Sequence, residues 1–336
     1  MKKNIKEIRR LRKKLAKVQQ RKLRKFTPIK QKVSKLDKIL SNSLFDVEHA
    51  LSLYATSFFY LPANLIYDKE ILKEYEEISK KCHIYIIGYL PKTKLLNARQ
   101  IDNTAVLEYE IDSQTHNLTL PLPKGCTLES DDMGVYAVNE DGQKFAVPEK
   151  AINHFLKEHS KFEVKYIGQA YGKDGSRNAL DRLLKHETLQ KISLTGVPAD
   201  KNLQLLLLEV EPNTQLITAL NPFAKIKDKN GTRIKAGINK LFNTTEQERI
   251  SLYEAALIRY FYPQFNKEFK DSFPSTRLKV LQDCYDKDFS MVTAEIIFDD
   301  LPFQLYSEVV EPSRSHMAKH DLHNDKQRKA FFYEAD

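Results

Sequence analysis

Two stretches of the chain carry side chains that could together hydrolyse a phosphodiester. In chain order they supply a phenol, a guanidinium, an imidazole and a carboxylate, at Tyr166, Arg182, His186 and Glu254. A phenol or an imidazole can orient or deprotonate a water molecule, and a guanidinium can neutralise charge that develops on a phosphate. One carboxylate, completed by water and substrate oxygens, is a common way to hold Mg²⁺. These residue types therefore indicate hydrolysis assisted by one hard metal ion.

The first stretch, KYIGQAYGKDGSRNALDRLLKH, reads as the end of a strand, a glycine-containing loop and a helix. Side chains alternate along a strand, so Val164 and Tyr166 are expected on one face and Ile167 on the other. The helix is expected to bury one apolar stripe, formed by Ala179, Leu180, Leu183 and Leu184. On the neighbouring face it is expected to present three polar residues, Asn178, Arg182 and His186. A solvated arginine beside a surface histidine is the alternative. The strand–loop–helix setting favours a site, because backbone can approach phosphate closely there.

The second stretch predicts a helix that opens with a capping box, Thr245 and Glu248, and runs to about Phe261, before Pro263. Glu254 falls inside the apolar sector of this helix. An ionised carboxylate in that sector loses hydration, at a cost of roughly several kcal/mol unless a metal ion or an arginine compensates it. The alternatives are that the side chain reaches solvent or pairs with a core arginine. We interpret Glu254 as a metal ligand.

Taken in order, these residues resemble the motifs of the GIY-YIG nuclease superfamily over about residues 160–270. The matches are Tyr166-Ile167-Gly168 for the second tyrosine motif, Arg182 for the helix arginine, His186 one turn later, Glu254 for the metal-binding carboxylate, and Asn266 in the ending Pro263-Gln264-Phe265-Asn266. The loop between Gly168 and Arg182 is longer than usual for the family. The resemblance implies an α/β (α+β) fold whose small core is a three-stranded, mainly antiparallel sheet flanked by helices.

The first tyrosine motif of the family is not found in its usual place, ten or so residues before the second. The nearest candidate is Gly134-Val135-Tyr136, about thirty residues upstream. A hairpin strand, QKFAV, and a predicted helix, EKAINHFLKEH, lie between the two motifs. Tyr136 can serve as the first tyrosine if this intervening piece is an insertion, and we include it among the candidate catalytic residues.

The resemblance implies an endonuclease that depends on Mg²⁺ or Mn²⁺ and cuts double-stranded DNA, and a role in restriction or phage defence would fit. Tyr166 would orient or deprotonate the attacking water, Arg182 would neutralise developing charge and Glu254 would hold the metal. His186 would support the phosphate or the water. The candidate nucleic-acid contacts near the site are Gly168, Gln169, Lys173, Asn178, Lys185 and Asn266. The alternatives are an inactive nucleic-acid-binding protein on the same fold, and an RNase or a nuclease specific for modified DNA.

The formal net charge of +9 combines two unlike parts of the chain. Residues 1–40 contain 17 lysines and arginines and two acidic residues, a net charge of +15, which leaves −6 for the remainder. Apolar residues at helical spacing on either side of Pro28 predict two very basic amphipathic helices. We interpret this arm as binding the nucleic-acid backbone, through residues that include Arg9, Arg10, Lys13 and Lys14. A homo-oligomer or partner contact, and an anionic membrane surface, are the alternatives.

The length of the chain predicts two or three domains. We expect the basic arm (1–40), a domain that is first helical and then β-rich (41–148), the nuclease-like core (149–270, with 203–211 as its third strand), and a C-terminal α/β extension (271–336) with a polar helical tail. Residues 41–98 are expected to be largely helical and to end in an apolar strand, HIYIIGYL, and the extension is expected to contain a strand in SMVTAEIIF. In the β-rich part we expect VLEYEI to pair with LTLPL, and GVYAV with QKFAV about an Asp141-Gly142 turn.

The remaining signals exclude several classes of protein. Three scattered cysteines, Cys82, Cys126 and Cys284, predict neither a disulfide framework nor a zinc ribbon. The first residues lack the apolar core of a secretory signal, and the longest apolar run is too short and polar to span a bilayer, so we expect a cytoplasmic protein. His316, His320 and His323 are expected to form a polar or phosphate-contacting patch on a helix rather than a metal site.

Overall fold

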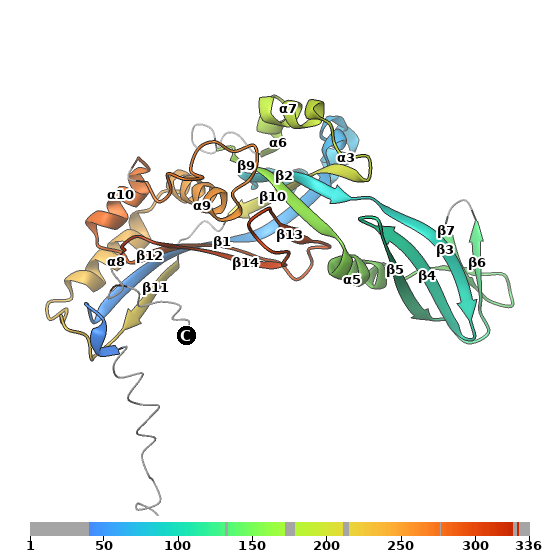
Figure 1. Cartoon of the computed structure of the whole chain (residues 1–336), viewed down its shortest axis with the longest axis horizontal. Helices are drawn as coiled ribbons and strands as arrows, with labels where there is room; N and C mark the ends of the chain where they lie inside the picture. The colour runs from blue at the N-terminus through green and yellow to red at the C-terminus, as the bar shows by residue number, and fades with distance from the viewer. Residues whose placement is uncertain are drawn as a thin grey trace, which may run out of the picture.

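The computed structural model describes residues 40–131, 134–171, 179–210, 215–275, 277–324 and 328. The predicted contacts Arg9, Arg10, Lys13, Lys14, Lys173 and Asn178 lie outside the described residues. The described chain is a mixed α/β protein with one large curled sheet, two small antiparallel sheets and eight α-helices, labelled α3 to α10 (Figure 1). The α/β class predicted from the sequence is confirmed. None of the described helices is long and apolar enough to cross a membrane.

The large sheet is built from strands that are far apart in the sequence. Its order is β13-β9-β2-β10-β1-β12-β14, and β11 also pairs with β1. The strands are β1 (Val47–Pro62), β2 (Ile84–Pro91), β9 (Lys161–Gln169), β10 (Lys201–Val210), β11 (Gln215–Leu220), β12 (Met291–Ile297), β13 (Gln304–Tyr306) and β14 (Ser315–Asp321). β12 is parallel to β1 and β13 is parallel to β9, whereas the other neighbours are antiparallel. The sheet therefore takes strands from each of the segments 41–148, 149–270 and 271–336.

Strand β1 contradicts the prediction that residues 41–98 are largely helical. It is 16 residues long, and its first seven residues are all buried. The mostly apolar run LSLYATSFFYL (51–61) in this strand is compatible with a buried strand as well as with a buried helix, so periodicity alone does not separate the two. The helices of this segment are short: the 3-10 helix η1 (Ala63–Tyr67), α3 (Lys69–Glu74) and α4 (Glu76–Ser79).

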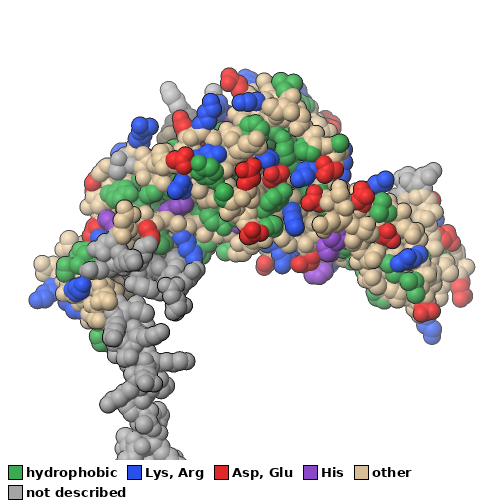
Figure 2. All heavy atoms as spheres, viewed as in Figure 1, with side chains coloured by type: hydrophobic (Ala, Val, Ile, Leu, Met, Phe, Trp, Pro, Cys, Tyr) green, Lys and Arg blue, Asp and Glu red, His purple; other side chains and the backbone are tan. Residues whose placement is uncertain are grey.

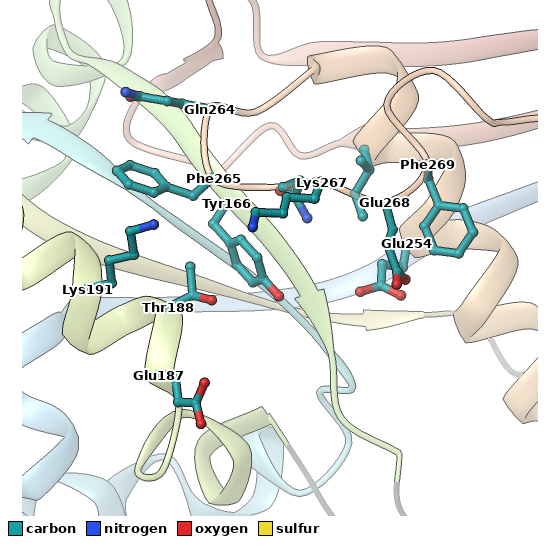
Figure 3. A pocket seen from close by; sticks show the side chains of 12 residues that line it. Tyr166, Glu187, Thr188, Lys191, Glu254, Gln264, Phe265, Lys267, Glu268 and Phe269 are labelled. Atoms are coloured by element: carbon teal, nitrogen blue, oxygen red, sulfur yellow. The ribbon is translucent and has the colours of Figure 1, made fainter.

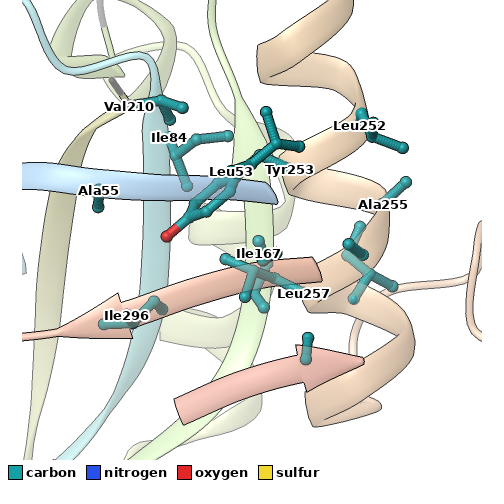
Figure 4. Packing of buried hydrophobic residues seen from close by; sticks show 14 of the residues in the cluster. Leu53, Ala55, Ile84, Ile167, Val210, Leu252, Tyr253, Ala255, Leu257 and Ile296 are labelled. Carbon is teal, nitrogen blue, oxygen red and sulfur yellow. The ribbon is translucent and has the colours of Figure 1, made fainter. Parts of the chain in front are cut away.

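Helices cover both faces of the large sheet, so alternate residues of one strand belong to different cores. On one face, Ile84, Ile86, Leu206 and Leu208 pack with α9 (Glu246–Phe261) and α10 (Lys279–Asp286) (Figure 4). On the other face, Tyr85, Ile87, Leu205 and Leu207 pack with η1, α6 (Ala179–Leu183) and α7 (Glu187–Thr195). Helix α8 (Thr232–Asn243) lies against β1 and β11. Burial on both faces explains why β2 and β10 read as unbroken apolar runs.

Residues 92–160, between β2 and β9, form a separate unit at one end of the molecule (Figure 1). Its elements are β3 (Thr93–Ile101), β4 (Thr104–Ile111), β5 (Gln114–Pro121), β6 (Thr127–Asp131), β7 (Gly134–Val138), β8 (Lys144–Ala146) and α5 (Glu149–His159). The unit has its own small core, which includes Leu107, Ile111 and Phe155. The predicted pairings of β4 with β5 and of β7 with β8, and the predicted helix α5, are confirmed.

Candidate active site

A cavity of about 480 Å³ lies between β9, α7, α9 and the segment that follows α9. Its lining is polar over much of its extent and contains two of the predicted site residues, Tyr166 and Glu254 (Figure 3). The other lining residues are Glu187, Thr188, Lys191, Ile258, Gln264, Phe265, Asn266, Lys267, Glu268 and Phe269. The cavity thus joins the two stretches of chain that the sequence singled out.

A second tyrosine, Tyr85 of β2, lies beside Tyr166. Its ring is 6.2 Å from the Tyr166 ring and 5.3 Å from the His186 ring, and the Tyr166 and His186 rings are 5.2 Å apart. In the β2–β9 ladder Tyr85 is opposite Gly168. A Cβ atom on Gly168 would come within 2.5 Å of the Tyr85 ring, so only glycine leaves room for this ring. Gly168, predicted as a nucleic-acid contact, therefore has a steric function here.

The strand beside β9 carries Tyr85, whereas the sequence analysis expected Tyr136 on it. Among the described residues, Tyr136 lies on β7, which pairs with β6 and β8 in a small three-stranded sheet, and it does not line the cavity. The strand next to β9 is β2, which comes before residues 92–160 instead of within them. Tyr136 therefore does not lie on the strand beside Tyr166. The apolar strand that contains Tyr85 was recognised, but a tyrosine in an apolar strand is ordinarily a core residue.

The groups around the two phenols come from neighbouring helices. The charge of Arg182, on α6, acts on both tyrosine oxygens, and Thr188, on α7, lines the cavity together with Tyr166. Burial raises the pKa of both tyrosines, and the nearby Glu254 charge raises them further. Both phenols are therefore protonated at neutral pH. Thr188 is a contributor that the sequence analysis missed.

The strand β9 does not alternate as the sequence predicts. Val164 and Ile167 pack in the core under α9, whereas Tyr166 packs on the opposite face. The reason is a β-bulge: Ile87 is opposite Tyr166, but the next residue, Gly88, is opposite Val164. The extra residue, Lys165, shifts the alternation by one position, so the prediction that Val164 and Tyr166 share a face is wrong. The bulge turns Tyr166 toward Tyr85 and the cavity.

Glu254 projects from α9 into the cavity near the Tyr166 hydroxyl (Figure 3). Burial raises the pKa of its carboxyl to about 8, and the adjacent Glu268 carboxylate acts in the same direction. Hydrogen bonds from the side chain and the backbone of Gln169, and the charge of Arg182, partly offset this effect. Gln169, predicted as a nucleic-acid contact, is instead placed against Glu254 and, at 3.3 Å, Ser251.

His186 and Arg182 lie close together, but not on one continuous helix as predicted. Helix α6 ends at Leu183, and His186 is the N-cap of α7, where its Nδ1 accepts from the Leu189 N–H at 3.2 Å. Burial, reinforced by the Arg182 charge, lowers the pKa of His186 to about 4, so the ring is neutral at neutral pH. With Nδ1 accepting, the proton of the neutral ring is assigned to Nε2.

Asn266 holds the chain after α9 against the YIG strand. Its Oδ1 accepts from the Ile167 N–H at 2.9 Å, and its Nδ2 donates to the Ile167 carbonyl at 2.8 Å. The Phe265 N–H adds a hydrogen bond of 3.0 Å to the Lys165 carbonyl. The Asn266 amide thus positions the cavity wall. Lys185, another predicted contact, is exposed on the link between α6 and α7 and does not line the cavity.

The C-terminal histidines do not form the predicted helical patch. His316 and His320 lie on β14, and His316 is buried, with Nε2 2.8 Å from the Ser313 carbonyl and 3.0 Å from the Leu305 carbonyl. His320 Nε2 is 2.9 Å from the Ala256 carbonyl, and His323 is 3.4 Å from Asp288. These histidines therefore fasten β14 and its neighbours. In the part of the chain that the structure describes, no group of three or more histidine, cysteine or acidic side chains could hold a metal ion.

No protein-family model, no curated protein and no solved structure matches the chain. Its function must therefore be inferred from the residues and their geometry.

Proposed function

We propose that the protein is a metal-dependent endonuclease of the GIY-YIG type that hydrolyses phosphodiester bonds in DNA. The observation that carries this proposal is the pair Tyr85 and Tyr166, on adjacent antiparallel strands, clustered with Arg182, His186 and Glu254. A tyrosine on the strand next to the YIG strand is what the resemblance requires. With Tyr85 in that place, β9, β2 and β10 correspond to the small three-stranded core, and residues 92–160 correspond to an insertion between its two tyrosine strands.

The residues at the cavity fit a divalent metal ion. The half-buried Glu254 carboxyl has a pKa raised by burial and by Glu268, so the charge of Arg182 and the polar groups of Gln169 compensate its ionised form only in part. Glu254 would hold the ion. Glu268 is close enough to Glu254 for its negative charge to raise the pKa of the Glu254 carboxyl. When bound, Mg²⁺ or Mn²⁺ would supply Lewis-acid stabilisation of the charge on the phosphate.

The remaining groups have complementary tasks. Tyr166 is protonated and lines the cavity, so its O–H can donate to a water or a phosphate oxygen there and orient it. The Arg182 side chain is exposed, and its positive charge acts on the four groups around it: Tyr85, Tyr166, His186 and Glu254. A phosphate bound near these groups would therefore be stabilised by the same positive charge. The neutral His186 supports the tyrosine rings.

Two lysines support a polyanionic substrate. Lys191 on α7 and Lys267 after α9 line the same cavity, and both extend toward the space around Tyr166 (Figure 3). Within the described residues, neither side chain forms an ion pair. Lysines in this arrangement can bind the phosphates on either side of the scissile one.

The test is to incubate the purified protein with plasmid DNA and with RNA, in Mg²⁺ and in EDTA. The proposal expects DNA cleavage in Mg²⁺, none in EDTA, and none by the Glu254→Gln variant. Binding of DNA without cleavage under all conditions would favour the inactive nucleic-acid-binding protein. Cleavage of RNA alone would favour the RNase.

A further inference from the structure

One corner of the molecule exposes large apolar side chains that the candidate active site does not use. The corner consists of the end of β11, the loop 221–231 and α8, and its exposed apolar residues are Leu220, Phe223, Ile226, Ile234, Ile238 and Phe242. Phe242 is 78% exposed, Leu220 70% and Phe223 61%. Large apolar side chains gathered in this way usually mark a surface that binds something.

The apolar stripe on α8 is held facing outward. Ile234, Ile238 and Phe242 are spaced four residues apart, so they lie along one face of the helix. On the opposite face, Gly237 meets His49 of β1, and the buried Lys240 binds Asp283 at 2.7 Å. The helix cannot rotate its apolar stripe inward without breaking these contacts.

The same corner is strongly cationic. Lys225, Lys227, Lys229 and Lys235 are exposed around the apolar side chains. Between residues 215 and 243 the one acidic residue is Asp228, and its carboxylate accepts from the N–H groups of Thr232 and Arg233 at the start of α8. Figure 2 shows hydrophobic side chains next to lysine or arginine side chains at this end of the molecule.

The basic arm joins the molecule at this corner. The Leu40 carbonyl accepts from Asn221 Nδ2 at 2.6 Å, and the Ser43 carbonyl accepts from the Lys225 N–H at 3.1 Å. Leu40, where the described chain begins, therefore lies beside the lysines of the loop.

We propose that this corner docks on an anionic phospholipid bilayer. Phenylalanine, leucine and isoleucine side chains would enter the boundary between headgroups and acyl chains, while the exposed lysines of the corner would bind the anionic headgroups. A nucleic-acid backbone would use the lysines but would leave the apolar side chains uncovered. A second copy of the chain would bring two cationic corners together. Because the cavity lies on other elements, β9, α7 and α9, this docking is independent of the proposed nuclease activity.

The experiment is flotation of the full-length protein with vesicles of phosphatidylcholine, with and without phosphatidylserine. The wild type should bind the anionic vesicles about tenfold more tightly or better, and Phe223→Ser/Phe242→Ser should lose about tenfold of that affinity. The matched control is Ile101→Ser/Phe145→Ser, which removes two similarly exposed apolar side chains, 50% and 47%, from the unit 92–160. The control should bind as the wild type does, and because all four side chains are exposed, all variants should keep the wild-type unfolding temperature.

Equal binding of wild type and Phe223→Ser/Phe242→Ser to anionic vesicles would overturn the proposal, because attraction by the arm alone would then be sufficient. A variant that changes from dimer to monomer in sedimentation, with no change in vesicle binding, would assign the corner to a second copy. A loss of DNA affinity without a loss of vesicle binding would assign it to nucleic acid.

Discussion

At the scale of single residues, the candidate site combines groups that are unfavourable for folding and useful for hydrolysis. A half-buried carboxyl with a pKa raised to about 8, and a neutral imidazole with a pKa lowered to about 4, lie around two protonated phenols. Titratable groups with pKa values moved this far are characteristic of functional sites. Their consequences for stability and activity can be measured separately.

Glu254→Gln should change how the stability of the metal-free protein depends on pH. The pKa of Glu254 in the folded protein, about 8, lies above the ordinary value of 4.5. Its contribution is therefore fully present below about pH 4.5 and is lost as the pH rises through about 8. The free energy of unfolding of the wild type should fall over this window, relative to that of the variant, by up to a few kcal/mol. Urea unfolding in EDTA at several pH values measures this difference.

Added Mg²⁺ provides the control for the same pair of proteins. At the upper end of the pH window, Mg²⁺ should stabilise the wild type and leave Glu254→Gln unchanged. Parallel stability curves for the two proteins, with and without Mg²⁺, would rule out both the raised pKa and the metal-binding role.

Tyr85→Phe should reduce cleavage by about 10²-fold and leave DNA affinity unchanged. The substitution removes the hydroxyl on which the Arg182 charge acts but keeps the ring that packs on Gly168. Single-turnover cleavage and DNA binding in EDTA measure the two quantities. Tyr136→Phe is the matched control and should behave as the wild type, and loss of activity in that variant alone would return the role to Tyr136.

At the scale of elements, the site depends on how β9 meets its neighbours. The Gly168 backbone passes under the Tyr85 ring, a bulge at Lys165 turns Tyr166, and the Asn266 amide fixes the segment after α9. Each of these features involves a contact between segments that are distant in the sequence. The segment Tyr166-Ile167-Gly168 therefore contributes to strand packing as well as to the candidate site.

Gly168→Ala should destabilise the protein by about 1–3 kcal/mol, because the added methyl overlaps the buried Tyr85 ring. Urea unfolding of the single variant measures the loss. In Tyr85→Leu/Gly168→Ala the ring is gone, so the combined loss should be smaller than the sum of the two single losses. Additive losses would show that Tyr85 does not lie over Gly168.

Lys191→Gln and Lys267→Gln should each weaken DNA binding and lower the slope of log affinity against log salt by about one. The two lysines belong to α7 and to the segment after α9, so both sides of the cavity are tested. Fluorescence anisotropy in EDTA measures binding without cleavage. Lys185→Gln, on the link between α6 and α7 outside the cavity, is the matched control, and an equal effect there would show that the cavity has no special affinity for phosphate.

At the scale of the whole molecule, the most basic segment of the chain and the candidate catalytic residues belong to different parts of the sequence. The described sheet and its helices hold the candidate site, whereas the first 40 residues hold 17 of the 54 lysines and arginines. The insertion between β2 and β9 has its own core and leaves the two tyrosine strands paired. Strands β2 and β9 therefore pair although the separate unit 92–160 lies between them in the chain.

Deletion of residues 1–39 should leave a folded protein that binds DNA more weakly and with a flatter dependence on salt. The remaining chain carries a net charge of −6, and the apolar residues of the arm are too sparse for it to form part of the main core. Cleavage at saturating DNA should persist, because the candidate catalytic residues remain. If the salt dependence of the truncated protein equals that of the full-length chain, the arm does not contact phosphate.

The elements whose signals are local could be predicted from the sequence. Helix α9 begins with the predicted capping box of Thr245 and Glu248 and ends at Phe261, and α5, β10, β12 and the hairpin pairings are close to their predicted places. Capping, periodicity and turn residues act between neighbours in the chain, so they can be read without the fold. Tyr166, Arg182 and Glu254 could likewise be identified as candidate site residues from the sequence alone.

Only the tertiary structure decided which residues complete the site. The partner of Tyr166 is Tyr85, from a strand that precedes the whole insertion, and no local signal specifies which strands pair. The position of Thr188, the raised pKa of Glu254 and the steric need for Gly168 all result from burial against distant segments. The sequence by itself thus determined the chemical types and the helices and strands that carry them. Long-range strand pairing and burial then determined which phenols meet, because those interactions depend on proximity in space and not in the chain.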